Sequence, residues 1–203
     1  MIAIVDYGVG NLFSLVSSFK KIGADIVVTA DPKVIMESER IILPGVGAFE
    51  DAAKKLRDSG LDKVLIDQVQ QGKKLLGICL GMQMLFENSF EYGCHKGLGL
   101  LKGNVVPIKG AIPECLKIPH IGWNALQFTN KSDLFNFIND GDCVYFVHSF
   151  YVTDCDDSLV ATAEYGAQLT AAVQKGNILG CQFHPEKSGE VGLNILRAFC
   201  EME

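Results

Sequence analysis

The sequence predicts an α/β fold, a single domain over residues 1–203 whose mostly parallel sheet is flanked by helices, with additional strands in the second half. In the first half, short apolar runs alternate with longer segments of helical spacing, which is typical of a parallel sheet covered on both faces. In the second half, short strand-like runs follow one another between Gly, Asn and Asp turns. A chain of 203 residues is long enough for one domain with its own hydrophobic core.

The first half supplies the parallel part of the predicted sheet. Strands are predicted from short apolar runs at residues 2–5, 25–29, 40–43 and 75–78. Helices are predicted at residues 12–22, 50–58 and 61–71, where helical spacing ends near Gly23, Gly60 and Gly72. Open sheets bind ligands beyond the carboxyl ends of their strands, and both Val46 and Cys79 fall there.

The second half consists mainly of predicted strands. They cover residues 97–108, 116–128, 143–152, 160–165, 169–175 and 178–183. The tripeptide Lys175-Gly176-Asn177 is a plausible hairpin connection between the last two, and a final helix is predicted near residues 191–201. No repeat, low-complexity tract or linker interrupts the chain, which favours one domain.

The composition is that of an ordinary soluble globular protein, with 48% hydrophobic and 21% charged residues. A net charge of −6, without a Lys/Arg cluster longer than a pair, argues against a nucleic-acid surface. The N-terminus lacks the basic region of a signal peptide, and no apolar stretch approaches the roughly 20 residues that span a bilayer. The seven cysteines form no C-x-x-C pair and no zinc-ligand spacing, which predicts a reduced, cytoplasmic protein.

A cysteine stands between two glycines after the fourth predicted strand, in Gly77-Ile78-Cys79-Leu80-Gly81, and an apolar segment of helical appearance follows. This is the thiol counterpart of the G-x-S-x-G turn, which exposes a nucleophile between a strand and a helix. A Cβ at either glycine would collide with neighbouring backbone, and amides at a helix N-terminus favour the thiolate. Taken alone, the segment fits either a nucleophile or a buried cysteine in a strand.

A histidine and a carboxylate follow the last predicted strand. His184 and Glu186 flank Pro185, so in an extended segment their side chains would share one face. A carboxylate beside an imidazole orients it and stabilises the imidazolium. Together with the nucleophile turn, this pair favours catalysis over packing, and Cys79, His184 and Glu186 are the predicted catalytic residues.

These segments resemble the class I, triad-type glutamine amidotransferases, and more narrowly the glutaminase subunits of imidazole glycerol phosphate synthase, from histidine biosynthesis. The resemblance covers nearly the whole chain and implies the class I amidotransferase fold. The Cys79 turn and the His-Pro-Glu segment mark the superfamily, whereas Pro-Gly-Val-Gly, Gly-Trp-Asn and Pro-Glu-Lys-Ser indicate the subfamily. The matching segments, besides the Cys79 turn, are Asp-Tyr-Gly-Val-Gly-Asn (6–11), Leu-Pro-Gly-Val-Gly-Ala-Phe (43–49), Pro-His-Ile-Gly-Trp-Asn (119–124), Tyr-Phe-Val-His-Ser-Phe (145–150) and Phe-His-Pro-Glu-Lys-Ser (183–188).

The resemblance implies hydrolysis of the side-chain amide of glutamine. Cys79 would attack the amide carbonyl, His184 would take the thiol proton and later protonate the departing ammonia, and Glu186 would orient His184. The expected oxyanion-hole donors are the amides of Leu80 and Val46, and a flip of the Val46 peptide could switch this hole on. The residues expected to bind the substrate are Gly45, Gly47, Gln83, Ser149 and Phe150.

The resemblance also implies a partner, because ammonia released to water would be lost or protonated. In the resembling family the partner is a cyclase of the (β/α)₈-barrel type, which makes imidazole glycerol phosphate and AICAR. The residues expected near that interface are Asn11, Pro119, Trp123 and Tyr145, although core packing is an equal alternative for the last two.

No cofactor and no metal are expected. Gly8-Val9-Gly10 follows a strand, but Phe13 stands where the dinucleotide fingerprint requires glycine. His120 and His148 have no second metal ligand at usable spacing, so both are predicted to be structural.

Two other functions remain open at this stage. A paralogue with the same glutaminase chemistry could supply ammonia to another acceptor, such as a surface sugar. The segment 102–107 lacks the arginine expected after the Leu-Gly-Leu turn, which leaves the acceptor unassigned. A non-catalytic regulatory or binding subunit on the same fold is the alternative of another class, and the intact Cys79, His184 and Glu186 speak against it.

Overall fold

The structure is a computed structural model that describes residues 1–202, and a central eight-stranded sheet organises it. The strand order is β2-β1-β3-β4-β14-β13-β12-β9. Strands β1, β2, β3, β4 and β14 run parallel, and the remaining three pair antiparallel. The strands are β1 (Ile2–Val5), β2 (Ile26–Thr29), β3 (Arg40–Gly45), β4 (Lys74–Cys79), β9 (Gln127–Phe128), β12 (Leu159–Glu164), β13 (Gln168–Lys175) and β14 (Ile178–Cys181).

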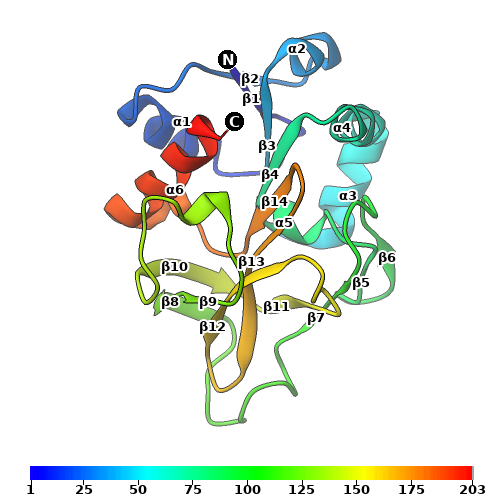
Figure 1. The fold of residues 1–203 in the computed structure, drawn as a ribbon. Helices are drawn as coiled ribbons and strands as arrows, with labels where there is room; N and C mark the ends of the chain where they lie inside the picture. The colour runs from blue at the N-terminus through cyan, green and yellow to red at the C-terminus, as the bar shows by residue number, and fades with distance from the viewer. Residues whose placement is uncertain (203) are drawn as a thin grey trace.

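Helices cover both faces of this sheet, as predicted (Figure 1). The inner parallel strands are mostly apolar, so their side chains pack alternately into two cores, with Ile4 on one face and Ala3 and Val5 on the other. Helices α1 (Leu12–Lys21) and α6 (Gly189–Glu201) pack on the first face. Helices α2 (Pro32–Glu37), α3 (Phe49–Asp58) and α4 (Leu61–Gln70) pack on the second. The α/β prediction is therefore confirmed.

Two smaller sheets lie beside the central one. One pairs β8 (His120–Ala125) with β10 (Cys143–His148), and the other has the order β11-β7-β5-β6. Its strands are β5 (Asn88–Ser89), β6 (His95–Lys96), β7 (Asn104–Pro107) and β11 (Phe150–Thr153). The strand predicted at 143–152 is thus two strands in different sheets, broken at Ser149, whose carbonyl accepts the Ile108 N–H at 2.9 Å.

Other sequence predictions need local correction. Residues 97–103 do not form a strand, because the N–H groups of residues 97–101 donate to the carbonyls of residues 84–87 and not to a neighbouring strand. The predicted strand at 116–128 is two short strands, β8 and β9. Helix α2 was not predicted, although Asp31 caps it by accepting from the Lys33 N–H at 2.9 Å and Pro32 opens it. The hairpin between β13 and β14 is confirmed, with Lys175 paired to Ile178.

The carboxyl ends of three adjacent parallel strands meet at one edge of the central sheet. Strand β3 ends at Gly45, β4 at Cys79 and β14 at Cys181, and β4 lies between the other two. The chain leaves β14 into a 3₁₀ turn, η2 (Pro185–Lys187). This edge is where open sheets of this type place ligands. Within residues 1–202, no helix is long and apolar enough to cross a membrane.

Candidate active site

Cys79 lies on a tight turn at the end of β4. Its backbone is in a strained region, with φ 55° and ψ −111°. A Cβ on Gly77 would lie 2.7 Å from the Gly81 carbonyl oxygen, and one on Gly81 would lie 1.9 Å from the Leu43 carbonyl oxygen. The two glycines are therefore required by close backbone approach, as predicted. The helix that follows, α5 (Leu80–Gln83), is a single turn. The stabilisation of the thiolate expected from a helix N-terminus therefore comes only from the N–H groups of this turn.

His184 and Glu186 contact each other behind the nucleophile. His184 Nδ1 lies 2.8 Å from Glu186 Oε1, and the two side chains are 3% and 5% exposed. The prediction that they share the face of an extended strand is wrong, because β14 ends at Cys181 and Pro185 begins the turn η2. The turn brings the two side chains together instead.

The environment of His184 favours its protonated form. Burial lowers the pKa of the imidazole, but interactions with Cys79 and Glu186 and their negative charges outweigh burial and raise this pKa to about 9. The ring therefore holds a proton at neutral pH. Such an imidazolium can stabilise a neighbouring thiolate and can later deliver the proton to a leaving group.

Replacing the carboxylate in Glu186→Gln should lower the pKa of His184, since the amide keeps the shape and loses the charge. Because the pKa of His184 is higher in the folded chain than the ordinary histidine value of 6.5, its protonation stabilises the fold. This stabilisation is complete at pH values below 6.5 and is lost as pH rises through about 9. The loss of unfolding free energy in Glu186→Gln should therefore be larger near pH 6 than near pH 10. Ring NMR titration and chemical denaturation measure both effects. Glu190→Gln, an exposed site with the same charge change, is the control, and an unchanged His184 pKa would contradict the coupling.

Gln182 is a site residue that the sequence did not reveal. It is fully buried, its Nε2 lies 3.7 Å from Cys79 Sγ, and its Oε1 accepts from Gln83 Nε2 at 2.9 Å. The only sequence signal was a polar residue within an apolar run. Gln182 links the nucleophile to Gln83, the side chain expected to bind substrate.

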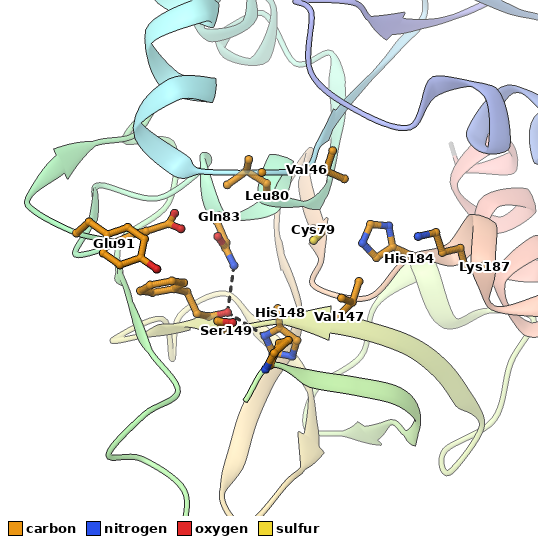
Figure 2. A pocket seen from close by; sticks show the side chains of 14 residues that line it. Val46, Cys79, Leu80, Gln83, Glu91, Val147, His148, Ser149, His184 and Lys187 are labelled. Atoms are coloured by element: carbon orange, nitrogen blue, oxygen red, sulfur yellow. Dashed lines mark hydrogen bonds between the residues drawn. The ribbon is translucent and has the colours of Figure 1, made fainter. Parts of the chain in front are cut away.

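A cavity of about 340 Å³ opens over Cys79 (Figure 2). This volume suits a small molecule. His184 lies on one side of Cys79, and Gln83 and Glu91 lie on the other. The lining residues are Val46, Gly47, Cys79, Leu80, Gln83, Glu91, Tyr92, Pro119, Val147, His148, Ser149, Phe150, His184 and Lys187.

The predicted catalytic, oxyanion-hole and substrate-binding residues line this cavity, with two exceptions. Gly45 is the buried last residue of β3, where a Cβ would lie 2.9 Å from both the Gly81 nitrogen and the Tyr7 hydroxyl, so its role is close packing. Glu186 stands behind His184. The sequence did not predict five lining residues, because their positions depend on tertiary contacts. They are Glu91 and Tyr92 from a loop, Val147 and His148 from β10, and Lys187 from η2.

The edge formed by Ser149 and Phe150 offers backbone groups to the cavity. Phe150 is paired with Pro107 across β11 and β7, and proline has no N–H to donate. The pair therefore exchanges no hydrogen bonds, and the N–H and C=O of Phe150 point away from β7 toward the open edge of β11. The Phe150 carbonyl accepts from Gln83 Nε2 at 3.1 Å, and His148 Nδ1 lies 2.8 Å from it.

The loop after β3 lies directly beside Cys79. The pairing of β3 with β4 continues to Gly45 opposite Cys79, and residues 46–48 are then exposed. Both ends of this loop are fixed: the Tyr7 hydroxyl donates to the Pro44 carbonyl at 2.7 Å, and the Phe49 N–H donates to Glu91 at 2.7 Å. Gly47 has φ 98°, which glycine adopts readily. Only the peptides around Val46 and Gly47 lie between these fixed points.

Three of the residues predicted near a partner, Pro119, Trp123 and Tyr145, line the cavity or are linked by direct contacts to a lining residue. Trp123 is 57% exposed and contacts Tyr145 edge-to-face, with ring centroids 6.1 Å apart. Lys187, which lines the cavity, lies over the Tyr145 ring at 5.7 Å. Asn11 is exposed at the start of α1, and Pro119 lines the cavity itself. Core packing is thus excluded for Trp123, whereas Tyr145 is half-buried.

His120 and His148, predicted to be structural, contact each other at the cavity, which His148 lines. His120 Nδ1 lies 3.0 Å from His148 Nε2, and the two residues are 2% and 6% exposed. Residues 1–202 contain no group of three or more His, Cys, Asp or Glu side chains that could hold a metal ion. The pair instead belongs to a hydrogen-bonded chain that reaches Phe150.

The chain matches a known family over nearly its whole length. The family model for class I glutamine amidotransferases matches residues 3–202. Imidazole glycerol phosphate synthase subunit HisH from Geobacter metallireducens is 47% identical over 202 residues, covering 98% of this chain and 96% of the relative. The HisH subunit from Caldanaerobacter subterraneus is 49% identical over 203 residues, covering 100% and 98%.

Solved structures with low sequence identity share the fold. A glutamine amidotransferase structure superposes with a TM-score of 0.76 at 18% identity, covering 98% of both chains. The PurLQS structure from Thermotoga maritima gives a TM-score of 0.73 at 23% identity, covering 97% of this chain and 95% of the other. These two similarities support the class I fold expected from the sequence.

Proposed function

The chain belongs to the class I glutamine amidotransferases, among the HisH subunits of imidazole glycerol phosphate synthase, and we propose that Cys79, His184 and Glu186 carry out its glutaminase reaction. One observation carries this assignment of roles. A cysteine held at φ 55° faces a cavity beside a buried histidine whose carboxylate partner lies at 2.8 Å. Strained backbone of this kind is stored at functional sites.

The proposed reaction hydrolyses the side-chain amide of glutamine in two steps. Cys79 Sγ attacks the amide carbon after His184 has taken the thiol proton, and the intermediate expels ammonia as His184 returns that proton. A γ-glutamyl thioester remains on Cys79. Water then attacks the thioester with His184 as base, which releases glutamate and restores the thiol.

The tetrahedral intermediate carries an oxyanion that needs preorganised donors. The Leu80 N–H follows the nucleophile directly, and the Val46 amide belongs to the loop on the other side of Cys79. Loss of one such donor typically costs about 10²–10³ in rate. We assign both amides to the oxyanion hole, with the Val46 peptide as the adjustable one.

The far side of the cavity suits the amino-acid end of glutamine. The N–H of Phe150 can bind the α-carboxylate, and Glu91 supplies a negative charge for the α-ammonium group. Both N–H groups of Gln83 are already donated to Phe150 and Gln182, so its Oε1 is the atom that can accept from the α-ammonium group. Glu91 also accepts the Phe49 N–H at 2.7 Å, so one carboxylate joins the substrate site to the end of the Val46 loop. Gly47 and Ser149 line the cavity between these groups.

The similarity to HisH subunits bears on which ammonia acceptor this chain serves, a question that the sequence alone left open. HisH subunits that are 46–49% identical over the full length of this chain favour the histidine-pathway synthase over a paralogue serving a surface sugar. The missing arginine in segment 102–107 therefore does not set this chain apart from that family. A purely regulatory subunit would not need the strained cysteine and its buried histidine pair.

As a synthase subunit, this protein acts in a complex. We assign the partner to the (β/α)₈-barrel cyclases, which consume ammonia to make imidazole glycerol phosphate and AICAR. Exposed Trp123 contacts half-buried Tyr145, which contacts Lys187 at the cavity, so direct contacts join the outer surface to the cavity. A partner bound there lies next to the site of ammonia release, and Asn11 and Pro119 extend the same proposed interface.

The proposal is tested by glutaminase rates of the free chain, of its complex with the cyclase, and of the complex with acceptor substrate. We expect slow hydrolysis by the free chain and the largest rate with acceptor, because a partner must favour the active orientation of the Val46 peptide to change the rate. Glutamine-dependent formation of imidazole glycerol phosphate is measured in parallel. Equal rates in all three states would contradict the gated loop, and absence of glutamine hydrolysis throughout would contradict the function.

A further inference from the structure

His148 is held in a single tautomer by what surrounds it. Its Nδ1 lies 2.8 Å from the Phe150 carbonyl, and a carbonyl oxygen only accepts, so Nδ1 must carry the hydrogen. Burial lowers the pKa of His148 to about 4, so at neutral pH its other nitrogen, Nε2, is a bare acceptor. A hydrogen-bond donor at Nε2 is compatible only with this tautomer, so it reinforces the hydrogen on Nδ1.

His120 is that donor. His120 Nδ1 lies 3.0 Å from His148 Nε2, so Nδ1 of His120 carries the hydrogen. Burial also lowers the pKa of His120, and its remaining nitrogen, Nε2, accepts from Asn124 Nδ2 at 3.3 Å. Asn124 Nδ2 also donates a hydrogen bond to the Glu164 carbonyl at 2.8 Å, which holds the amide in position. Each bond in this chain thus has one direction, from Asn124 to the Phe150 carbonyl.

The ring of His120 is fixed by stacking as well as by hydrogen bonds. It lies between Phe146, with ring centroids 4.8 Å apart, and Tyr165, with centroids 4.2 Å apart, and both rings are within about 21° of parallel. Strand β8 carries both His120 and Asn124 on its inner side. The position of the His120 donor is therefore set by the strand and by its two aromatic neighbours.

The chain ends on groups that face the cavity. The Phe150 carbonyl accepts hydrogen bonds from both His148 and Gln83. Gln83 also donates to Gln182, whose Nε2 lies 3.7 Å from Cys79 Sγ. Loss of the donor from His148 would leave this carbonyl with a single partner and free the edge of β11 to move. The same edge presents the N–H of Phe150 to the cavity.

We propose that His120 is a positioning residue of the glutamine site, which selects the His148 tautomer that donates to the Phe150 carbonyl and so fixes the edge of β11 that binds the amino-acid end of glutamine. This inference rests on the proposed glutaminase function. It assigns His120 no contact with substrate. The hydrogen bond that one imidazole nitrogen makes determines which nitrogen carries the proton, and here the determining bond comes from a second histidine.

Two substitutions of His120 by amide side chains distinguish the effect of losing the N–H donor from the effect of losing the aromatic ring. His120→Asn places an N–H near the former Nδ1, so it retains the donor to His148, whereas His120→Gln places its amide near Nε2 and removes that donor. Both lose the stacked ring and both are neutral, so each controls for the other. The variants are compared in the complex with the cyclase, and ammonia-dependent synthesis reports on assembly.

We expect His120→Gln to raise the KM for glutamine about tenfold while kcat changes less than about threefold, because the amino-acid end is bound equally in the ground and transition states. His120→Asn should stay within about twofold of the wild-type KM. Nitrogen NMR of the ring should show His148 with its proton on Nδ1 in the wild type and in His120→Asn, and a mixture in His120→Gln.

Equal KM values for the two variants would overturn the proposal, as would a wild-type His148 with its proton on Nε2. The tautomer measurement uses the free wild-type chain, so a proton found on Nε2 overturns the proposal even where a variant fails to fold. Failure of the glutaminase function itself is recognised separately, because the wild-type complex would then not hydrolyse glutamine at all.

Discussion

Cys79→Ala should abolish glutamine-dependent product formation by the complex, with a loss of about 10⁴-fold or more, while ammonia-dependent synthesis stays within about twofold of wild type. The nucleophile is needed only to release ammonia from glutamine, and removing the nucleophile of a triad leaves only residual catalysis. The cyclase receives external ammonia without passing through the thioester. Both activities are measured on the same reconstituted complex.

The matched control is Cys94→Ala, which removes an exposed thiol outside the cavity and should leave both activities intact. Cys79→Ser provides a second nucleophile variant of nearly the same size, and we expect it to lose glutamine turnover as well. Glutamine-dependent synthesis that survives in both Cys79 variants would remove the basis for the whole catalytic assignment.

Val46→Pro should lower glutamine turnover by about 10²–10³-fold, equivalent to about 3–4 kcal/mol of oxyanion stabilisation, and should spare ammonia-dependent synthesis. Proline removes the amide that we assign to the oxyanion hole. The residue is 41% exposed, in a loop anchored by Pro44 on one side and Phe49 on the other. The substitution therefore acts on the loop without opening a cavity in the core.

Val46→Ala is the control, because it trims the same side chain and keeps the amide. We expect it to retain glutamine turnover within about threefold of wild type. If Val46→Ala and Val46→Pro lost activity equally, the side chain rather than the amide would be responsible. If neither lost activity, the Val46 amide would have no part in the oxyanion hole.

The nucleophile turn was predictable because its causes are local. Gly77 leaves room for the Gly81 carbonyl and Gly81 leaves room for the Leu43 carbonyl, and the strand before the turn is a mostly apolar run. The meeting of Cys79 with the Val46 loop followed from parallel strands, whose carboxyl ends share one edge. The pairing of His184 with Glu186 was predicted correctly but for the wrong reason, since a 3₁₀ turn and not a strand joins them.

The parts that could not be predicted depend on contacts between distant segments. His120 meets His148 only because β8 and β10 pair in a register that sets these two residues opposite each other. Gln182 meets Gln83 across the cavity floor, 99 positions apart in sequence. Glu91 reaches the start of α3 from a loop after β5. Nothing in the local pattern around these residues distinguishes them from ordinary polar positions.

The most direct test of the central claim is to trap the thioester. The complex is mixed with glutamine and acceptor, quenched in acid during turnover, digested and examined by mass spectrometry, with isotopically labelled glutamine to identify the added group. The account predicts a γ-glutamyl group on the peptide that contains Cys79, and none on that peptide in Cys79→Ser. Turnover without an adduct on Cys79, or with the label on another cysteine, would contradict it.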